Sequence, residues 1–184
     1  MSMILINGSP RKEGCTYTAL KEVAKSLEKA GVDYEIIQAS MDSREIDAIA
    51  KKVASSDGLV VGSPVYYASA SGLCTYFLDE LFNRVNGAMR LKPAAAIVSC
   101  RRGGASATFD QINKYFTISE MIVVSSNYWN QVHGNTPEEV LRDEEGMQTM
   151  RILGNNLAYV LKSLKKANLE LPESEKKVKT NFIR

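Results

Sequence analysis

The residues best suited to chemistry lie in a polar loop, "NGSPRKEGCTYTAL" (residues 7–20), which follows a short apolar run. Ser9, Arg11, Thr16 and Thr18 surround the start of the amphipathic segment that comes next. A helix N-terminus offers free amides and a positive dipole end, so hydroxyls and one guanidinium beside it suit a terminal phosphate. The glycine spacing fits neither the GxGxxG fingerprint nor the GxxxxGK[ST] loop of nucleotide-binding proteins. A plain helix cap beside a solvated arginine is the alternative interpretation.

A second loop, "GSPVYYASASGL" (residues 62–73), offers a surface for a flat ligand. Pro64 stiffens this loop, and the small side chains of residues 68–71 allow a ligand to approach the backbone closely. Tyr66 and Tyr67 place two aromatic rings where a core has no need of them. For each tyrosine, packing at the rim of a sheet is the alternative to ligand binding.

The elements that must position these loops alternate between strands and helices in five rounds. Strands are expected at 3–6, 34–37, 58–61, 94–98 and 121–124, and helices at 20–27, 46–53, 73–85, 109–116 and 150–164. This alternation is typical of a parallel α/β sheet with helices on both faces, whose ligands lie at the carboxyl ends of the strands. We expect one domain over residues 1–184 with a polar tail from about residue 170, and a site formed by loops 7–16, 62–72, 99–107 and 125–137.

The composition argues against several classes of protein. A formal net charge of +2, spread along the chain, provides no strong field for nucleic acid or a membrane surface. No apolar stretch approaches the length of a membrane span. Cys15, Cys74 and Cys100 are too few and too scattered for a disulfide framework. We expect a soluble, cytoplasmic protein in a reducing compartment, with neither nucleic acid nor membrane as partner.

Taken together, "NGSPRKEGCT" and "GSPVYYASASGLCTYFLDEL" resemble the flavodoxin-like NADPH-dependent FMN reductases and the related iron–sulfur flavoproteins. The resemblance extends to about residue 165 and implies a doubly wound, five-stranded parallel sheet of order 2-1-3-4-5. It also implies FMN as the cofactor, bound where the strand order reverses.

By position, the resemblance assigns the FMN phosphate to Ser9, Arg11, Cys15 and Thr16. The amide of Cys15 is the expected contact, because asparagine is more usual there. The resemblance assigns the ribityl chain and the ring edge to Pro64, Val65, Tyr66, Tyr67 and Ala68. The loop "CRRGGASA" would close over the ring, with close approach at Gly103 and Gly104 and a guanidinium near the pyrimidine end from Arg101 or Arg102. Solvation of both arginines is the alternative.

One departure from the resemblance concerns metal. The iron–sulfur relatives carry a compact cysteine cluster between the second strand and the next helix, where this chain reads "QASMDSREIDAIA". Three scattered cysteines do not supply the four thiolates of a cluster. We expect no iron–sulfur centre and no metal site, with Cys74 and Cys100 as small buried residues.

The function implied by the resemblance is an FMN-dependent oxidoreductase with NAD(P)H as the hydride donor and an acceptor such as free flavin or a quinone. The flavin carries the chemistry, so no catalytic side chain is expected. A flavodoxin-type electron carrier that docks on protein partners is one alternative, although such carriers are usually strongly acidic. A flavin-binding sensor without turnover is another. The sequence leaves open the physiological acceptor and the choice between NADH and NADPH.

Two further features bear on assembly and on the rim of the site. The loop "SSNYWNQVHGNTPEE" holds the only Trp and the only His of the chain. Local hydrogen bonding by His133 is favoured over catalysis, and Tyr128 and Trp129 either cover the flavin or pack on a partner subunit. The predicted helix 72–85 is apolar over a wide arc that includes Tyr76, which favours a homodimer or homotetramer.

Overall fold

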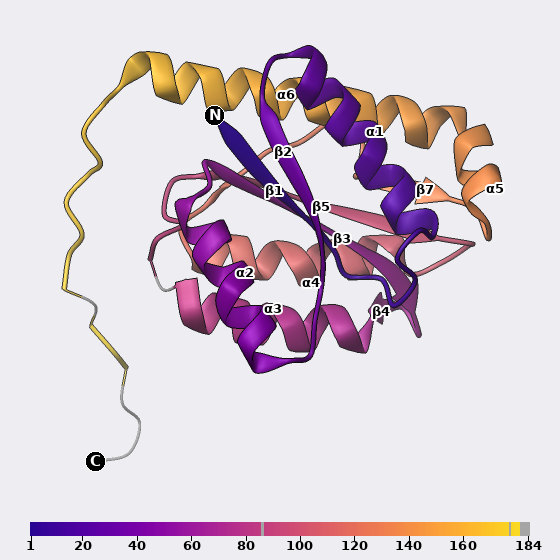
Figure 1. Cartoon of the computed structure of the whole chain (residues 1–184), viewed down its shortest axis with the longest axis horizontal. Helices are drawn as coiled ribbons and strands as arrows, with labels where there is room; N and C mark the ends of the chain where they lie inside the picture. The colour runs from indigo at the N-terminus through magenta and orange to yellow at the C-terminus, as the bar shows by residue number, and fades with distance from the viewer. Residues whose placement is uncertain (86, 177, 181–184) are drawn as a thin grey trace.

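The structure, a computed structural model, describes residues 1–85, 87–176 and 178–180 (Figure 1). Its strands are β1 (Ser2–Asn7), β2 (Asp33–Gln38), β3 (Gly58–Tyr66), β4 (Ser69–Ala70), β5 (Pro93–Cys100), β6 (Ile122–Val123) and β7 (Gln131–His133). Its helices are α1 (Cys15–Lys29), α2 (Ser43–Ser55), α3 (Gly72–Val85), α4 (Ala105–Ile118), α5 (Pro137–Arg142) and α6 (Glu144–Ala167).

The main sheet is parallel, with strand order β2-β1-β3-β5-β6. This is the expected order 2-1-3-4-5, because β4 is only a two-residue antiparallel partner of β3. β1 lies between β2 and β3, so that Asn7 is paired with Gln38 on one side and with Gly62 on the other. The carboxyl ends of the central strands therefore meet at one edge, from which both polar loops emerge.

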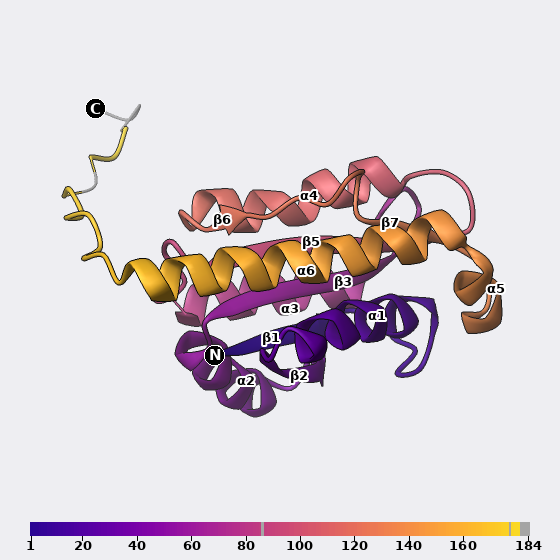
Figure 2. The ribbon, with the colours of Figure 1, turned by 90° about the horizontal axis from the view of Figure 1, so that it is seen from above.

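Side chains on the strands alternate between two cores, one on each face of the sheet. Ile4 and Ile6 pack with residues of α2, α3 and α4, whereas Met3 and Leu5 pack with residues of α1 and α6. Figures 1 and 2 show this division, with α1 and α6 on one face and α2, α3 and α4 on the opposite face. The expected doubly wound architecture is thus confirmed.

The two helices on the first face approach each other closely at Gly154. A Cβ atom on Gly154 would lie 2.6 Å from Ser26 Cβ and 2.7 Å from the Val23 carbonyl oxygen. Only a glycine lets the backbones of α6 and α1 come this near. The contact fixes the long C-terminal helix over the helix whose N-terminus faces the first polar loop.

The fifth strand is divided into two short pieces, β6 and β7, which both pair with β5. Val124 and Asn130 still form backbone hydrogen bonds with β5, but residues 125–129 between them leave the sheet, and the side chain of Asn130 is buried. Its Nδ2 donates to the Ala96 carbonyl oxygen (3.0 Å), and its Oδ1 accepts from Ser126 Oγ (2.7 Å). The sequence analysis placed a single strand at 121–124 and missed β7.

The apolar arc of α3 belongs mostly to the core. Phe77, Leu78 and Leu81 are buried, and Leu73 and Phe82 pack against the same cluster. Tyr76 is the aromatic residue that the arc leaves 39% exposed. The face therefore gives weaker support to a homodimer than its composition indicated, and the oligomeric state stays a prediction.

Among the described residues, no helix combines the length and the apolar character that a membrane crossing requires.

Candidate functional site

The loop after β1 is held from beneath by two amide side chains. Asn7, which is 1% exposed, donates from Nδ2 to the Lys12 carbonyl oxygen (3.0 Å) and to Gln38 Oε1 (2.9 Å). Its Oδ1 accepts from the Ser9 amide (3.2 Å), and Gln38 Nε2 donates to the Ser9 carbonyl oxygen (2.7 Å). These bonds fix the loop from both sides, since one amide comes from β1 and the other from the end of β2.

Gly8 brings the same loop against β3 and α3. Its amide donates to the Gly62 carbonyl oxygen (2.8 Å), and its own carbonyl oxygen accepts from Ser71 Oγ (2.6 Å). A Cβ atom on Gly8 would lie 2.6 Å from Cys74 Sγ, so the position requires glycine. The loop is therefore placed by contacts with three neighbouring elements before any ligand binds.

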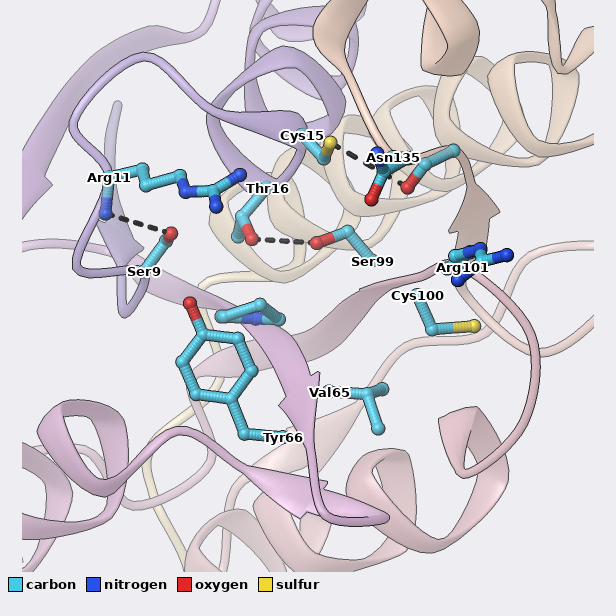
Figure 3. A pocket seen from close by; sticks show the side chains of 12 residues that line it. Ser9, Arg11, Cys15, Thr16, Val65, Tyr66, Ser99, Cys100, Arg101 and Asn135 are labelled. Carbon is cyan, nitrogen blue, oxygen red and sulfur yellow. Dashed lines mark hydrogen bonds between the residues drawn. The ribbon is translucent and has the colours of Figure 1, made fainter.

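The N-terminus of α1 opens toward this loop with its hydrogen-bond donors free. Its N-cap is Gly14, which has no side-chain cap, and its first turn holds no acidic residue. Within the described residues, the amides of residues 15–17 have no hydrogen-bond acceptor and the Arg11 guanidinium has no ion pair. Figure 3 shows the Arg11 side chain extending toward Thr16, over the first turn of the helix. Free amides, a helix dipole and an unpaired guanidinium together form an anion site.

A cleft beside this anion site brings together residues from four loops (Figure 3). It is lined by Ser9, Arg11, Cys15, Thr16, Pro64, Val65, Tyr66, Ser99, Cys100, Arg101, Gly134 and Asn135. Eight of these were predicted as site residues from the sequence: Ser9, Arg11, Cys15, Thr16, Pro64, Val65, Tyr66 and Arg101. Because the lining residues come from the loop after β1 and from the end of β3, the cleft lies at the point where the strand order reverses.

Four of the lining residues were predicted only as members of the loops 99–107 and 125–137 and not as individual site residues, namely Ser99, Cys100, Gly134 and Asn135. Ser99 shares a buried hydrogen bond of 2.8 Å with Thr16, between the two hydroxyl oxygens. The polar side chain of Ser99 at the end of an apolar strand was a signal that could have found it. Gly134 and Asn135 follow β7, and their place depends on the divided fifth strand.

Five predicted site residues do not line the cleft: Tyr67, Ala68, Arg102, Gly103 and Gly104. Tyr67 and Ala68 form the turn between β3 and β4, and Gly104 is the N-cap of α4 with a φ of 90°. A Cβ atom on Gly104 would lie 2.7 Å from the Cα of Ala68. The close approach that Gly104 permits is thus to the β3–β4 turn.

The thiols of the cleft are held in their protonated form. Burial raises the pKa of Cys15 and of Cys100 above the ordinary value for a thiol, and it raises the pKa of Cys74 in the core to about 12. Cys100 Sγ lies 3.4 Å from Nδ1 of His133, whose backbone amide donates to Asp143 Oδ2 (2.6 Å).

Across the described part of the chain, no three His, Cys, Asp or Glu residues are grouped so as to hold a metal ion.

Tyr128 and Trp129 lie outside the cleft lining. Their ring centroids are 4.9 Å apart, and the two side chains are 51% and 53% exposed. They project from the segment that separates β6 from β7. Within one chain, these rings do not contribute to the walls of the cleft.

Comparison with known proteins identifies the class to which this fold and cleft belong. The chain is a member of the NADPH-dependent FMN reductase family, whose model matches residues 1–136. It is 31% identical over 199 aligned positions to an iron–sulfur flavoprotein of Methanocaldococcus jannaschii, covering 90% of this chain and 100% of the relative. The family expected from the two loop motifs is confirmed.

Solved structures resemble the chain in fold. RosB with a bound 8-demethyl-8-formylriboflavin-5'-phosphate intermediate superposes with a TM-score of 0.77 at 12% identity, covering 99% of this chain and 92% of RosB. A WrbA-like flavodoxin from Agrobacterium tumefaciens gives a TM-score of 0.70 at 14% identity, covering 88% and 98% of the two chains. At these identities the likeness shows the flavodoxin-like fold alone.

Proposed function

We propose that this chain binds FMN in the cleft and acts as an oxidoreductase, with NAD(P)H as the hydride donor and a small acceptor such as free flavin or a quinone. The observation that carries the proposal is the anion site at α1. An unpaired guanidinium over three free amides matches a terminal phosphate monoester, and membership of an FMN reductase family supplies the flavin.

The lining residues fit FMN part by part. Ser9, Arg11 and the amides of Cys15 and Thr16 would hold the phosphate, because they surround the free helix terminus. The walls on either side, Pro64–Tyr66 and Ser99–Arg101, would hold the ribityl chain and one edge of the ring. Bound FMN supplies the two-electron chemistry, accepting a hydride and passing electrons to the acceptor.

The chain's own groups position the cofactor and leave the chemistry to it. Arg11 would neutralise the phosphate charge, and the Thr16–Ser99 hydrogen bond would keep both hydroxyls at the floor of the cleft. Arg101, which lines the opposite wall, would stabilise negative charge that develops on the bound ring.

We further propose that the protein works without an iron–sulfur cluster, although its relative from Methanocaldococcus jannaschii is named an iron–sulfur flavoprotein. The chain has three cysteines, and Cys74 is enclosed in the core with a pKa of about 12. A cluster requires about four thiolates held together. Iron and acid-labile sulfide in stoichiometric amounts in the purified protein would contradict this.

The purified protein tests the proposed function directly. Heat should release a pigment that chromatography identifies as FMN, and anaerobic NADPH or NADH should bleach the bound flavin. FAD, or no flavin at all, would refute the cofactor. If neither donor bleaches the flavin, the proposed oxidoreductase activity is refuted, and the alternatives that remain are an electron carrier and a flavin-binding sensor.

Arg11→Ala tests the anion site. Because hydrogen bonds to charged groups contribute about 1.5–3 kcal/mol, the variant should bind FMN at least about tenfold more weakly. Arg44→Ala is the matched control, since Arg44 has a side chain that is 93% exposed on the start of α2. An equal dissociation constant for Arg11→Ala and wild type would show that Arg11 is merely solvated.

A further inference from the structure

The chain that follows α6 leaves the domain as an exposed arm. Asn168 ends the helix with a φ of 45°, and Figures 1 and 2 show the next residues running as an extended trace away from the body of the molecule. We call residues 169–180 the C-terminal arm, of which the structure describes all but residue 177. Its apolar side chains Leu169, Leu171 and Val178 are 82%, 64% and 92% exposed. Such side chains are removed from water only when a second molecule covers them.

The base of the arm is fixed at one side of the sheet. Arg90 donates from Nη1 to the Pro172 carbonyl oxygen (2.8 Å) and from Nε to Glu120 Oε2 (2.6 Å). Arg90 and Glu120 lie in the loops before β5 and β6, so the arm begins on the side of these strands. Among the described residues, those beyond Pro172 form no hydrogen bond or ion pair. Positions 173–180 can span up to about 28 Å in extended form, enough to reach across the surface of a neighbouring molecule.

The opposite edge of the sheet, β2, has an unprotected amino half. In the described chain β2 pairs with β1 alone, and its residues Asp33–Glu35 are exposed. Natural edge strands are commonly blunted by a proline, a lysine or a bulge. β2, with the sequence "DYEIIQ", has neither residue, and its register with β1 is unbroken. The Gln38 side chain ties the carboxyl end to the Ser9 carbonyl oxygen (2.7 Å), so the amino half is the part that is open to another strand.

The charges of the arm and of this edge are opposite. An open pocket beside the start of β2 is lined by Glu28, Gly31, Val32, Asp33 and Tyr34, which include two carboxylates and no cation. Among the described residues, neither Glu28 nor Asp33 forms an ion pair. The end of the arm carries Lys176 and Lys179 on either side of Val178. A second copy of β2 would bring acids against acids, whereas this part of the arm brings lysines and an apolar side chain.

We propose that the C-terminal arm of one copy adds as a strand to the amino half of β2 in a second copy. Strand addition gains affinity from main-chain hydrogen bonds and specificity from the side chains that alternate along the strand. The two lysines of the arm would then lie near the carboxylates of Glu28 and Asp33.

The place where the arm begins identifies a second copy as the partner. Arg90 holds the base of the arm on the side of β5 and β6, and Figure 2 shows β2 at the other side of the sheet, so the arm points away from the edge of its own chain. A two-fold arrangement lets both arms bind at once and leaves no arm unpartnered. The inference requires no flavin, and it therefore stands apart from the proposed function.

Zero-length cross-linking of the full chain with a carbodiimide tests the contact, because this reagent joins an amine to a carboxylate only where the two touch. A denaturing gel separates the covalent dimer, and mass spectrometry of that band should find the two arm lysines joined to Glu28 or Asp33. The same joined peptides in the monomer band would overturn the second copy as the partner. Their absence from both bands would overturn the proposed site.

Charge reversal measures the same contact in solution through the dissociation constant of the dimer, determined by sedimentation. Asp33→Lys and Lys179→Glu should each raise this constant at least about tenfold, because a two-fold dimer holds the contact twice and reversal turns attraction into repulsion. Combined in one chain, the two changes should restore the constant to within about threefold of wild type. The matched controls, Asp110→Lys on α4 and Lys162→Glu on α6, make the same changes at exposed positions and should leave it unchanged.

A chain that ends at Pro172 keeps the contact with Arg90 and lacks the rest of the arm. Its dimer should also dissociate at least about tenfold more readily. An unchanged constant in this chain, a wild-type protein that is monomeric at every concentration, or a double variant no tighter than the single ones would overturn the proposal. None of these measurements needs flavin, so a protein that holds no FMN would refute the proposed function alone.

Discussion

Replacing Asn7 by aspartate probes the loop that carries the anion site with almost no change of shape. The Asn7 Nδ2 group uses its hydrogens on Gln38 Oε1 at 2.9 Å and on the Lys12 carbonyl oxygen at 3.0 Å. In Asn7→Asp a carboxylate oxygen would face these two acceptors at a position that is 1% exposed. Two lost hydrogen bonds cost about 1 kcal/mol each, and an uncompensated buried charge costs more. We expect a loss of about 3–5 kcal/mol of unfolding free energy at pH 7.

The pH dependence gives this prediction a definite sign. Burial opposite two acceptors should raise the pKa of the introduced carboxyl in the folded state above its value of about 4 in the unfolded state. The folded state then binds more protons between the two pKa values, so the loss of stability should shrink as the pH falls toward about 5. At low pH the protonated carboxyl also regains one donor.

Urea unfolding, followed by circular dichroism at two pH values, measures both effects. The matched control is Asn155→Asp, the same change at an exposed position of α6, which should leave the urea midpoint nearly unchanged. If Asn7→Asp and Asn155→Asp unfold at the same urea concentration, the amide pair does not hold the loop as described. FMN affinity, measured on the same samples, should fall with the stability of the loop.

Three further predictions follow from other contacts. Cys74 should resist iodoacetamide in the native protein at about pH 8, because its buried thiol has a pKa of about 12, while mass spectrometry should find it labelled after unfolding. Gly154→Leu should lower the unfolding free energy by about 1–3 kcal/mol, measured by urea unfolding, because the new side chain would clash with Val23 and Ser26. Gly72→Ala should have little effect in the same assay, because there is open space around Gly72. Sedimentation at micromolar concentration should show a homodimer, and a single species with the mass of one chain would contradict it.

Much of the fold was predictable, because apolar periodicity and glycine breaks mark elements that are buried on both faces of a sheet. The position of Ser9, Arg11 and Thr16 was also predictable, since a loop between the first strand and a helix must lie at the carboxyl edge. Asn135 was predicted only as part of the loop 125–137, because β7 is three residues long and its sequence, "QVH", carries no strand signal that would have fixed the position of the residues after it. Tyr67 was assigned to the site from its aromatic side chain and from the family resemblance, and its position in the β3–β4 turn was not predicted because that turn lacks the Asn-Gly signature of a hairpin.

The divided fifth strand affects how this molecule behaves among its own copies at high concentration. A long, flat edge of free N–H and C=O groups is a template on which another chain can add a strand and begin to aggregate. In the described part of the chain, the β5 side of the sheet presents only the two residues of β6 and the three of β7. Between β6 and β7, the side chain of Asn130 donates a hydrogen bond to the Ala96 carbonyl oxygen. In β7, the backbone amide of His133 donates to the carboxylate of Asp143 and is therefore not free to pair with another strand. This side of the sheet is thereby protected against continuous cross-chain sheet growth, and any association there would have to use side chains.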